Sequence, residues 1–324
     1  KDGWQVTVPS FRFDLAIEVD LIEELGRLYG YDKLPETRPQ GTVLTTNITE
    51  KMTQLERLQN LLVDRDYYEA VTYSFVEPKI QQLLAEDECA PIKLANPISA
   101  DLSVMRTSLW PGLVQALVYN AHRQHERVRL FEVGRVFKGD LDQIEQHRQI
   151  GGLFYGDRHA EQWSEKQSKV DFFDAKADVE ALLSVTGGDI RFDAAIHPAL
   201  HPGQTARIYK NGEAIGWLGA LHPKLNKPLD INGRVYVFEL SLSAVMQAQV
   251  PEFEVLSRFP AIRRDLALLV DDDVTAGKIE DCLSRIDSDT YILEMESRLA
   301  RKVSPWRSIS NTVSGHLPMM KLMR

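Results

Sequence analysis

The sequence has few cysteines and no long apolar run, and both absences narrow what the chain can be. Cys89 and Cys282 are its two cysteines. Neither lies in a metal-ligand spacing, and their scarcity fits a reducing compartment, so we expect a cytoplasmic location. No apolar run approaches the roughly 18 residues needed to cross a bilayer, so no membrane partner is expected. Residues 1–5 lack a signal-peptide core and read as the middle of a domain, which predicts that the chain is part of a longer protein.

Positively charged residues are fewer than negatively charged ones, and the common nucleotide-binding motifs are absent. The 38 Lys and Arg residues are outnumbered by 47 Asp and Glu residues, giving a net charge of −9. This balance argues against bulk coating of nucleic acid but permits a local basic face. There is no P-loop, no dinucleotide-binding fingerprint and no G-x-S-x-G nucleophile elbow. What remains is the composition of a soluble globular protein of two or three domains.

Three His-Pro pairs could suggest a metal site, but they are more typical of turns. They are His197-Pro198, His201-Pro202 and His222-Pro223.

Residues 1–39 form the first predicted unit. Trp4–Val8 alternates like a strand, and a helix follows with Ile17, Leu21, Leu25 and Leu28 on one face. Four carboxylates lie around the start of this helix: Asp14, Asp20, Glu23 and Glu24. Like charges at this density are unfavourable unless they share a cation, and oxygen-only ligands suit Mg²⁺. Spacing alone leaves a solvated acidic helix face as the alternative.

The stretch Leu94–Phe137 organises the middle of the chain. Met105-Arg106-Thr107-Ser108-Leu109 precedes Pro111 and Gly112, and Pro111 suits the first turn of a helix that should run to about Asn120. A strand is predicted over Val128–Phe137. Before this stretch, residues 40–50 read as a linker, a helix is expected from about Glu50, and Tyr68–Phe75 is a β-rich run.

Strands outnumber helices after residue 128, which predicts an α+β domain over 51–245 with a largely antiparallel sheet. The other expected elements are strands at 150–156, 207–209, 215–223 and 235–240, a turn at 201–206, and a helix from Val170 through Leu183.

A further unit starts near Pro251. Arg258, Arg263 and Arg264 surround a Phe-Pro turn before a buried strand, where they could hold phosphates or simply be solvated. A helix is expected from Thr275. Residues 296–324 show no steady period of either kind, so we expect the last domain to be aberrant after about residue 295.

The motifs N-P-I-S, M-R-T-S-L-W-P-G-L and L-F-E-V-G-R-V-F resemble the catalytic-like domain of the β subunit of bacterial phenylalanyl-tRNA synthetase. The segments R-F-D and D-L-I-E-E resemble the end of that family's B5 domain, and residues 257–270 resemble the start of its ferredoxin-like, anticodon-binding domain. The resemblance implies a class II synthetase-like antiparallel sheet domain at 51–245, flanked by part of a B5 domain at 1–39 and a partial ferredoxin-like domain at 251–324. It also implies that Asp14, Asp20, Glu23 and Glu24 are magnesium ligands, and it favours an RNA-binding role for Arg258, Arg263 and Arg264.

The resemblance implies a subunit that does not itself catalyse. Lys138 stands where class II synthetases have the arginine that holds the ATP phosphates, and no G-x-G-x-x-R segment follows. The expected partners are a catalytic α subunit in an α₂β₂ tetramer and tRNA(Phe), with ATP and phenylalanine at the α-subunit site. The helix near Leu113–Asn120 and the strand Val128–Phe137 are the predicted supports of this pairing. A free-standing regulatory or scaffolding protein on a recycled synthetase fold is the alternative. A shifted reading frame is our hypothesis for the tail.

Overall fold

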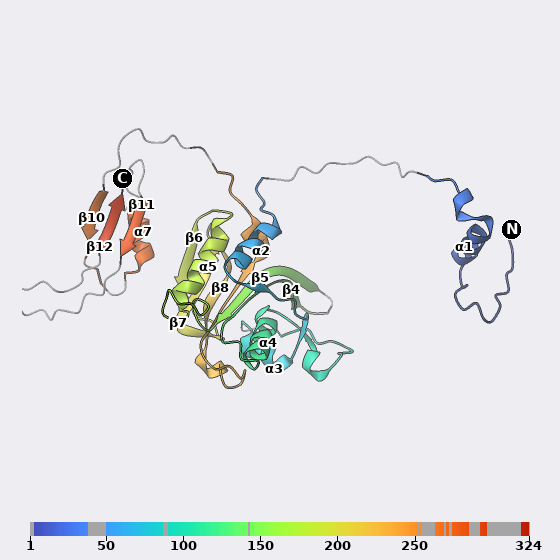
Figure 1. Cartoon of the computed structure of the whole chain (residues 1–324), viewed down its shortest axis with the longest axis horizontal. Helices are drawn as coiled ribbons and strands as arrows, with labels where there is room; N and C mark the ends of the chain where they lie inside the picture. Colours follow the sequence, from blue (N-terminus) through green and yellow to red (C-terminus); the bar gives the residue numbers. More distant parts are fainter. Residues whose placement is uncertain are drawn as a thin grey trace, which may run out of the picture. The chain divides into compact units, whose positions relative to one another are not determined.

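The computed structural model describes residues 3–37, 50–86, 90–141, 143–251, 253, 263–268, 270–271, 274–284, 292–296 and 319–323. The chain divides into two units, Lys1–Gln249 and Val250–Arg324 (Figure 1). Within the described ranges, no helix is both long enough and apolar enough to cross a membrane.

The N-terminal part consists of helix α1 (Glu18–Tyr29) and the short 3-10 turn η1 (Tyr31–Lys33). The predicted helix is confirmed, but no residue of α1 is buried. The predicted strand over Trp4–Val8 is wrong, because this segment pairs with no other strand among the described residues and Trp4 is 98% exposed. An alternating segment becomes a strand only when a partner takes its backbone N–H and C=O groups.

Seven strands form one sheet in the order β1-β4-β5-β9-β8-β7-β6. Their bounds are β1 (Tyr68–Glu69), β4 (Val128–Gly139), β5 (Ile144–Tyr155), β6 (Ile190–Ala194), β7 (Leu200–Lys210), β8 (Glu213–Leu221) and β9 (Val235–Ser241). Each neighbouring pair is antiparallel except β1 and β4, which run parallel. The prediction of an α+β domain with a largely antiparallel sheet is therefore confirmed. The strand β9, last of the seven in the sequence, lies in the middle.

Apolar residues alternate along the strands and feed two cores on the two sides of the sheet. On β9, Tyr236, Phe238 and Leu240 belong to one core, whereas Val235 and Val237 belong to the other. Helices α2 (Leu55–Asp64), α5 (Phe172–Ser184) and α6 (Leu242–Met246) contribute to the first core. Helices α3 (Pro78–Leu84) and α4 (Trp110–Ala121) contribute to the second.

The central stretch folds as predicted, with α4 carrying Pro111 in its first turn and β4 extending two residues beyond Phe137. The apolar side chains of both elements are buried in the chain's own core. Helix α4 buries Trp110, Leu113 and Leu117, and β4 lies between β1 and β5. Their apolar faces are therefore not available to support pairing with another subunit.

Other boundaries differ from the sequence-based expectations. The helix expected from Glu50 begins at Leu55, and Met52 is half exposed in an isolated bridge to Gln247. The β-rich run 68–75 gives only two short strands, β1 and β2 (Phe75–Val76), and β2 pairs with β3 (Val104–Met105). The turn expected at 201–206 lies inside β7, where the register with β8 shifts between Leu200 and Thr205. The strand β6 was not expected.

The second unit contains β10 (Arg263–Ala267), α7 (Ala276–Ser284), β11 (Ile292–Glu296) and β12 (Met319–Met323). The helix expected from Thr275 is confirmed. The strands form an antiparallel sheet in the order β10-β12-β11. A strand at 319–323 departs from the expectation that the tail lacks regular structure throughout; apolar residues make up most of this segment, Met319-Met320-Lys321-Leu322-Met323. The ferredoxin-like assignment stays a prediction.

Candidate functional site

A row of five residues crosses the large sheet on the side that faces the second core: Arg207, Trp217, Glu239, Gly151 and Glu132. Each residue lies directly opposite the next one on the neighbouring strand. Opposed residues on adjacent strands point to the same face, so these side chains share one side of the sheet. Part of the row lines a cavity of about 630 Å³, which we call the sheet cleft. The β8 and β9 positions were expected only as strand residues.

Glu239 lies on the floor of the sheet cleft, against the first turn of α4. Its Oε2 accepts hydrogen bonds from the Ser108 hydroxyl at 2.5 Å and from the Leu109 backbone N–H at 3.0 Å. Burial raises the pKa of Glu239 to about 7, although both hydrogen bonds and the positive charges of Arg106 and Lys138 act to lower it. Glu239 is therefore a carboxyl group that changes charge near neutral pH.

At the β4 end of the row, Glu132 forms a buried ion pair with Arg106. Arg106 Nη1 lies 2.7 Å from Glu132 Oε1, and the side chains are 3% and 4% exposed. The Thr72 hydroxyl donates to Glu132 Oε2, and Arg106 Nε donates to the carbonyl of Arg135. The arginine of the M-R-T-S-L motif is thus a structural residue that ties the segment before α4 to β4.

The other wall of the sheet cleft is aromatic. The ring of His197 stands edge-on to Trp110 at 5.2 Å and to Trp217 at 5.0 Å between centroids. The guanidinium of Arg207 lies 4.5 Å from the centre of the Trp217 ring. Glu86 closes this side, accepting from Trp217 Nε1 at 3.2 Å and lying 3.6 Å from Arg207 Nη1. Apolar surface, both signs of charge and hydroxyl groups therefore meet in one cavity.

Two of the three His-Pro pairs lie at turns, as predicted, whereas His201-Pro202 lies inside β7. In each, the histidine Nδ1 accepts from the backbone N–H two residues later, in Ala199, Gly203 and Lys224 respectively. No group of three or more His, Cys, Asp or Glu side chains suited to a metal ion occurs in the part of the chain that the structure describes.

Lys138 lies on the exposed end of β4 and lines the sheet cleft. A lysine is a compact point charge that cannot make the two parallel hydrogen bonds by which arginine holds a phosphate. That Lys138 takes the place of the class II arginine stays a prediction.

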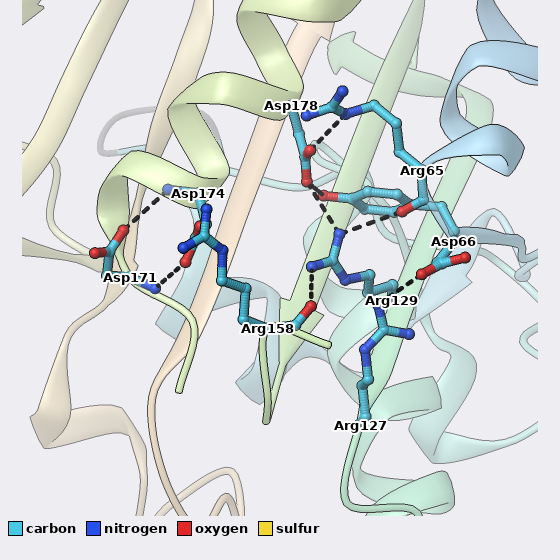
Figure 2. A network of polar contacts seen from close by, with 9 residues as sticks. Arg65, Asp66, Arg127, Arg129, Arg158, Asp171, Asp174 and Asp178 are labelled. Atoms are coloured by element: carbon cyan, nitrogen blue, oxygen red, sulfur yellow. Dashed lines mark hydrogen bonds and ion pairs between the residues drawn. The ribbon is translucent and has the colours of Figure 1, made fainter. Parts of the chain in front are cut away.

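A second polar cluster fixes α5 to the β1–β4 edge on the other side of the sheet (Figure 2). The buried Asp178 accepts from Arg65 Nε at 2.6 Å and from the Tyr67 hydroxyl at 2.8 Å, with Arg129 Nη1 at 3.4 Å. Arg129 also donates to the backbone carbonyls of Arg65 and Arg158. Burial, more than the nearby Asp178, raises the pKa of Tyr67 well above its usual value. Sequence spacing gave no sign of this cluster, because its members come from separate elements.

Arginines surround a smaller cavity at this cluster, of about 280 Å³, but each has a carboxylate partner. Asp178 pairs with Arg65 and Arg129, Asp66 with Arg127, and Asp174 with Arg158. Asp64 lines the same cavity, which brings the carboxylates to four for the four arginines, so the cluster is a structural clamp.

The four N-terminal carboxylates have separate partners. Arg12 bridges Asp14 and Glu24, and Arg27 also pairs with Glu24 at 2.6 Å. Asp20 accepts from the backbone N–H groups of Ala16 and Ile17 at 2.7 and 2.9 Å. Glu23 accepts from the Tyr31 hydroxyl. As arranged, these residues do not present a common set of free oxygens, so they do not fit a metal ion without rearrangement.

These contacts favour the charged forms of Asp14, Asp20 and Glu24. Arg12 lowers the pKa of Asp14, and Arg12 with Arg27 lowers that of Glu24 to about 2. The two backbone hydrogen bonds lower the pKa of Asp20.

Of the three arginines expected to bind RNA, Arg263 and Arg264 begin β10, opposite Met323 and Leu322. Arg258 lies outside the described residues. The structure therefore does not test whether the three come together.

Comparison with protein families places the chain among the aminoacyl-tRNA synthetases. The model described as "tRNA synthetase B5 domain" matches residues 1–31, and the model described as "Phenylalanyl tRNA synthetase beta chain CLM domain" matches residues 34–242. The chain belongs to the phenylalanyl-tRNA synthetase β chain family.

Curated relatives agree. The chain is 54% identical over 292 residues to the phenylalanine--tRNA ligase beta subunit of Nitrosococcus oceani, covering 89% of this chain and 37% of the relative. It is 52% identical over 282 residues to that of Pseudomonas fluorescens and 48% identical over 283 residues to that of Coxiella burnetii, each covering 36% of the relative. The coverage of this chain is 86% and 87%, respectively. The chain thus spans little more than a third of the length of these relatives.

Proposed function

We propose that the chain is part of the noncatalytic β subunit of a phenylalanine–tRNA ligase, in which a separate α subunit attaches phenylalanine to tRNA(Phe) with ATP and Mg²⁺. The observation that carries this proposal is a largely antiparallel seven-stranded sheet in a chain of the β chain family. It is supported by Lys138, which lines the sheet cleft and, by the resemblance, stands where class II synthetases have a phosphate-binding arginine. A domain that keeps its core but lacks this group supports catalysis by a partner.

The test is co-expression with an α subunit from a close relative, followed by size measurement and an aminoacylation assay. The purified chain alone is expected to show no ATP–pyrophosphate exchange, because its cleft cannot hold ATP in a reactive position. Exchange at the rate of an active synthetase would contradict the proposal. A free-standing scaffold, the alternative function, would form no complex with the α subunit.

We propose an α₂β₂ assembly in the cytoplasm and expect the segment around β1 to contact the α subunit. Tyr68, Val71 and Tyr73 are 74%, 91% and 68% exposed, next to the edge strand of the sheet. Aromatic residues are common at the centres of protein interfaces. Val71→Asp is expected to weaken α binding roughly tenfold or more, since it would bury an unpaired charge. The matched control is Ile196→Asp, at an exposed apolar residue elsewhere on the chain. Equal affinity of both variants for α would contradict this location.

We also propose Mg²⁺ as a ligand of Asp14, Asp20, Glu23 and Glu24. The support is that Arg12 already acts as a cation shared by Asp14 and Glu24, so the site favours positive charge. Binding would require Arg12 to release them. The Asp20→Ala, Glu24→Ala double variant is expected to lose saturable Mg²⁺ binding, measured by calorimetry. Titration identical to that of the parent would refute the site, and Glu18→Ala is the control for an acidic residue outside the set.

For tRNA, we propose that Arg258, Arg263 and Arg264 contact phosphates. Their replacement by alanine should weaken tRNA(Phe) binding by the assembled enzyme and reduce its salt dependence, since phosphate contacts release counterions. An unchanged salt slope would argue against this role.

A further inference from the structure

The chain contains two Asn-Gly pairs, Asn211-Gly212 and Asn232-Gly233, and they lie in different surroundings. A glycine has no side chain to shield its own backbone nitrogen, so this nitrogen can reach the side-chain carbonyl of the asparagine before it. We propose that Asn232 is a site of spontaneous deamidation in the folded chain, whereas the fold protects Asn211. The proposal concerns a covalent modification and does not rest on the proposed function.

The reaction exchanges the side-chain amide for a carboxylate without oxidation or reduction. The Gly233 nitrogen gives its proton to a base in the solvent and bonds to Cγ of Asn232. The bond between Cγ and Nδ2 then breaks, and Nδ2 takes up a proton and leaves as ammonia. Water opens the resulting succinimide ring. Attack at the side-chain carbonyl gives aspartate, and attack at the backbone carbonyl gives isoaspartate, so the net change is the gain of water and the loss of ammonia.

Both reacting groups at Asn232 are free of contacts that would restrain them. The Asn232 side chain is exposed and forms no hydrogen bond with any residue that the structure describes. The Gly233 N–H likewise has no acceptor among these residues. The Asn226 side chain donates to the Gly233 carbonyl at 3.1 Å, which is not one of the reacting groups. Ring closure at Asn232 therefore breaks no hydrogen bond within the described chain.

Tyr155 activates the attacking nitrogen. Its hydroxyl donates at 2.6 Å to the backbone carbonyl of Asn232, which shares a peptide bond with the Gly233 nitrogen. When that nitrogen loses its proton, resonance across the peptide bond places negative charge on this oxygen. A hydrogen bond to a charged acceptor is stronger than one to a neutral carbonyl, so the Tyr155 hydroxyl stabilises the attacking anion.

The charges around Asn232 act in the same direction. Asn232, Gly233 and Tyr155 line a cavity of about 380 Å³ together with Lys169 and Arg234. Asp157 takes up the charge of Lys169, at 2.9 Å between Nζ and Oδ1. Arg234 is thus the cation that favours both the deprotonated nitrogen and the carboxylate of the product.

Asn211 is also exposed, but its side chain is held in place. Its Oδ1 accepts from the Asp189 backbone N–H at 3.0 Å and from Gln249 Nε2 at 3.4 Å. Its own backbone N–H donates to the Asp189 carbonyl at 2.8 Å. The turn that contains it is closed by the pairing of Lys210 with Glu213. Ring closure at Asn211 must first rotate the side chain out of these contacts, which slows the reaction.

The test is to incubate the purified chain at neutral pH and physiological temperature, digest it with trypsin and measure deamidation at both positions by mass spectrometry. A sample digested before incubation gives the background. Asn232 is expected to react roughly tenfold faster than Asn211, because Asn211 must give up its hydrogen bonds. In guanidinium chloride the two rates should become similar, since neither pair is then held. A rate at Asn232 that is no higher than the rate at Asn211 in the folded chain would overturn the proposal.

Two variants test the route of the reaction. Asn232→Gln should abolish the reaction at this position and leave the rate at Asn211 unchanged. An isoaspartyl methyltransferase, used as a reagent, should label the incubated parent well above this variant. Equal labelling would overturn the succinimide route at Asn232.

Tyr155→Phe keeps the ring and removes the hydroxyl. It should slow deamidation at Asn232 roughly fivefold and leave Asn211 unchanged. The matched control is Tyr209→Phe, which removes a hydroxyl from β7 and should change neither rate. An unchanged or higher rate at Asn232 in Tyr155→Phe would overturn the role of Tyr155. None of these measurements involves the α subunit or tRNA, so they are independent of the proposed function.

Discussion

Glu239→Gln tests the energetics of the sheet cleft through pH. In the folded chain the pKa of Glu239 is about 7, against 4.5 for an ordinary glutamate. Between these two values the folded state holds a proton that the unfolded state has lost, so the free energy of unfolding falls as pH rises through this window. At about 1.4 kcal/mol per pH unit, the upper limit of the loss is about 3 kcal/mol. Because the carboxyl faces an open cleft, solvent screening reduces this to roughly 1–3 kcal/mol.

Glutamine resembles the protonated carboxyl, since its amide oxygen can accept from Ser108 and Leu109 and it carries no charge. At pH 5 the variant and the parent should therefore unfold at similar urea concentrations. At pH 8 the variant should be more stable by roughly 1–3 kcal/mol. Fluorescence of Trp110 and Trp217 reports on this part of the chain, and Glu86→Gln is the control for an exposed carboxylate in the same cavity. A difference between variant and parent that is the same at both pH values would refute the reasoning.

Two further substitutions test the packing around the site, both by urea unfolding. Arg129→Leu removes one cation from the buried Asp178 and should cost about 3 kcal/mol, whereas Lys176→Ala, in a partly exposed helical pair with Glu180, should cost less than about 1 kcal/mol. Comparable losses would show that the clamp is weaker than its burial implies. Gly134→Ala places a Cβ 2.2 Å from Arg106 Nη2 and 2.9 Å from Leu109 Cδ2, and the strain on the buried pair should cost about 2 kcal/mol. The control is Gly203→Ala, where the added Cβ would lie 3.4 Å from its nearest neighbour, His201 Cε1. An equal loss of stability in the control would contradict the argument.

Local patterns predicted the elements better than they predicted the site. Pro111 and the helical spacing after it placed α4, and the alternation from Val128 placed β4, because both signals lie within a single element. The Trp4–Val8 strand failed for the opposite reason: its alternation needs a partner strand.

The sheet cleft depends on register between distant strands. Arg207 and Glu239 line the same cavity only because β8 brings β7 and β9 into one sheet, and no spacing in the sequence records that order. The acidic set shows a related limit. The sequence predicted that the four carboxylates gather around the start of one helix. It did not predict their individual partners, such as Arg12, because these depend on side-chain conformations and not on spacing.

The central place of β9 determines the order in which the sheet can be completed during synthesis. The β4–β5 and β7–β8 hairpins can close as soon as each emerges, since their pairings are local. They cannot join until Val235–Ser241 arrives and pairs with β5 on one side and β8 on the other. Until then, each half presents an open edge with unpaired backbone groups. A chain that stops before Val235 would therefore have two separate half-sheets, each with an unpaired edge strand. We expect nascent chains of that length to need protection from aggregation.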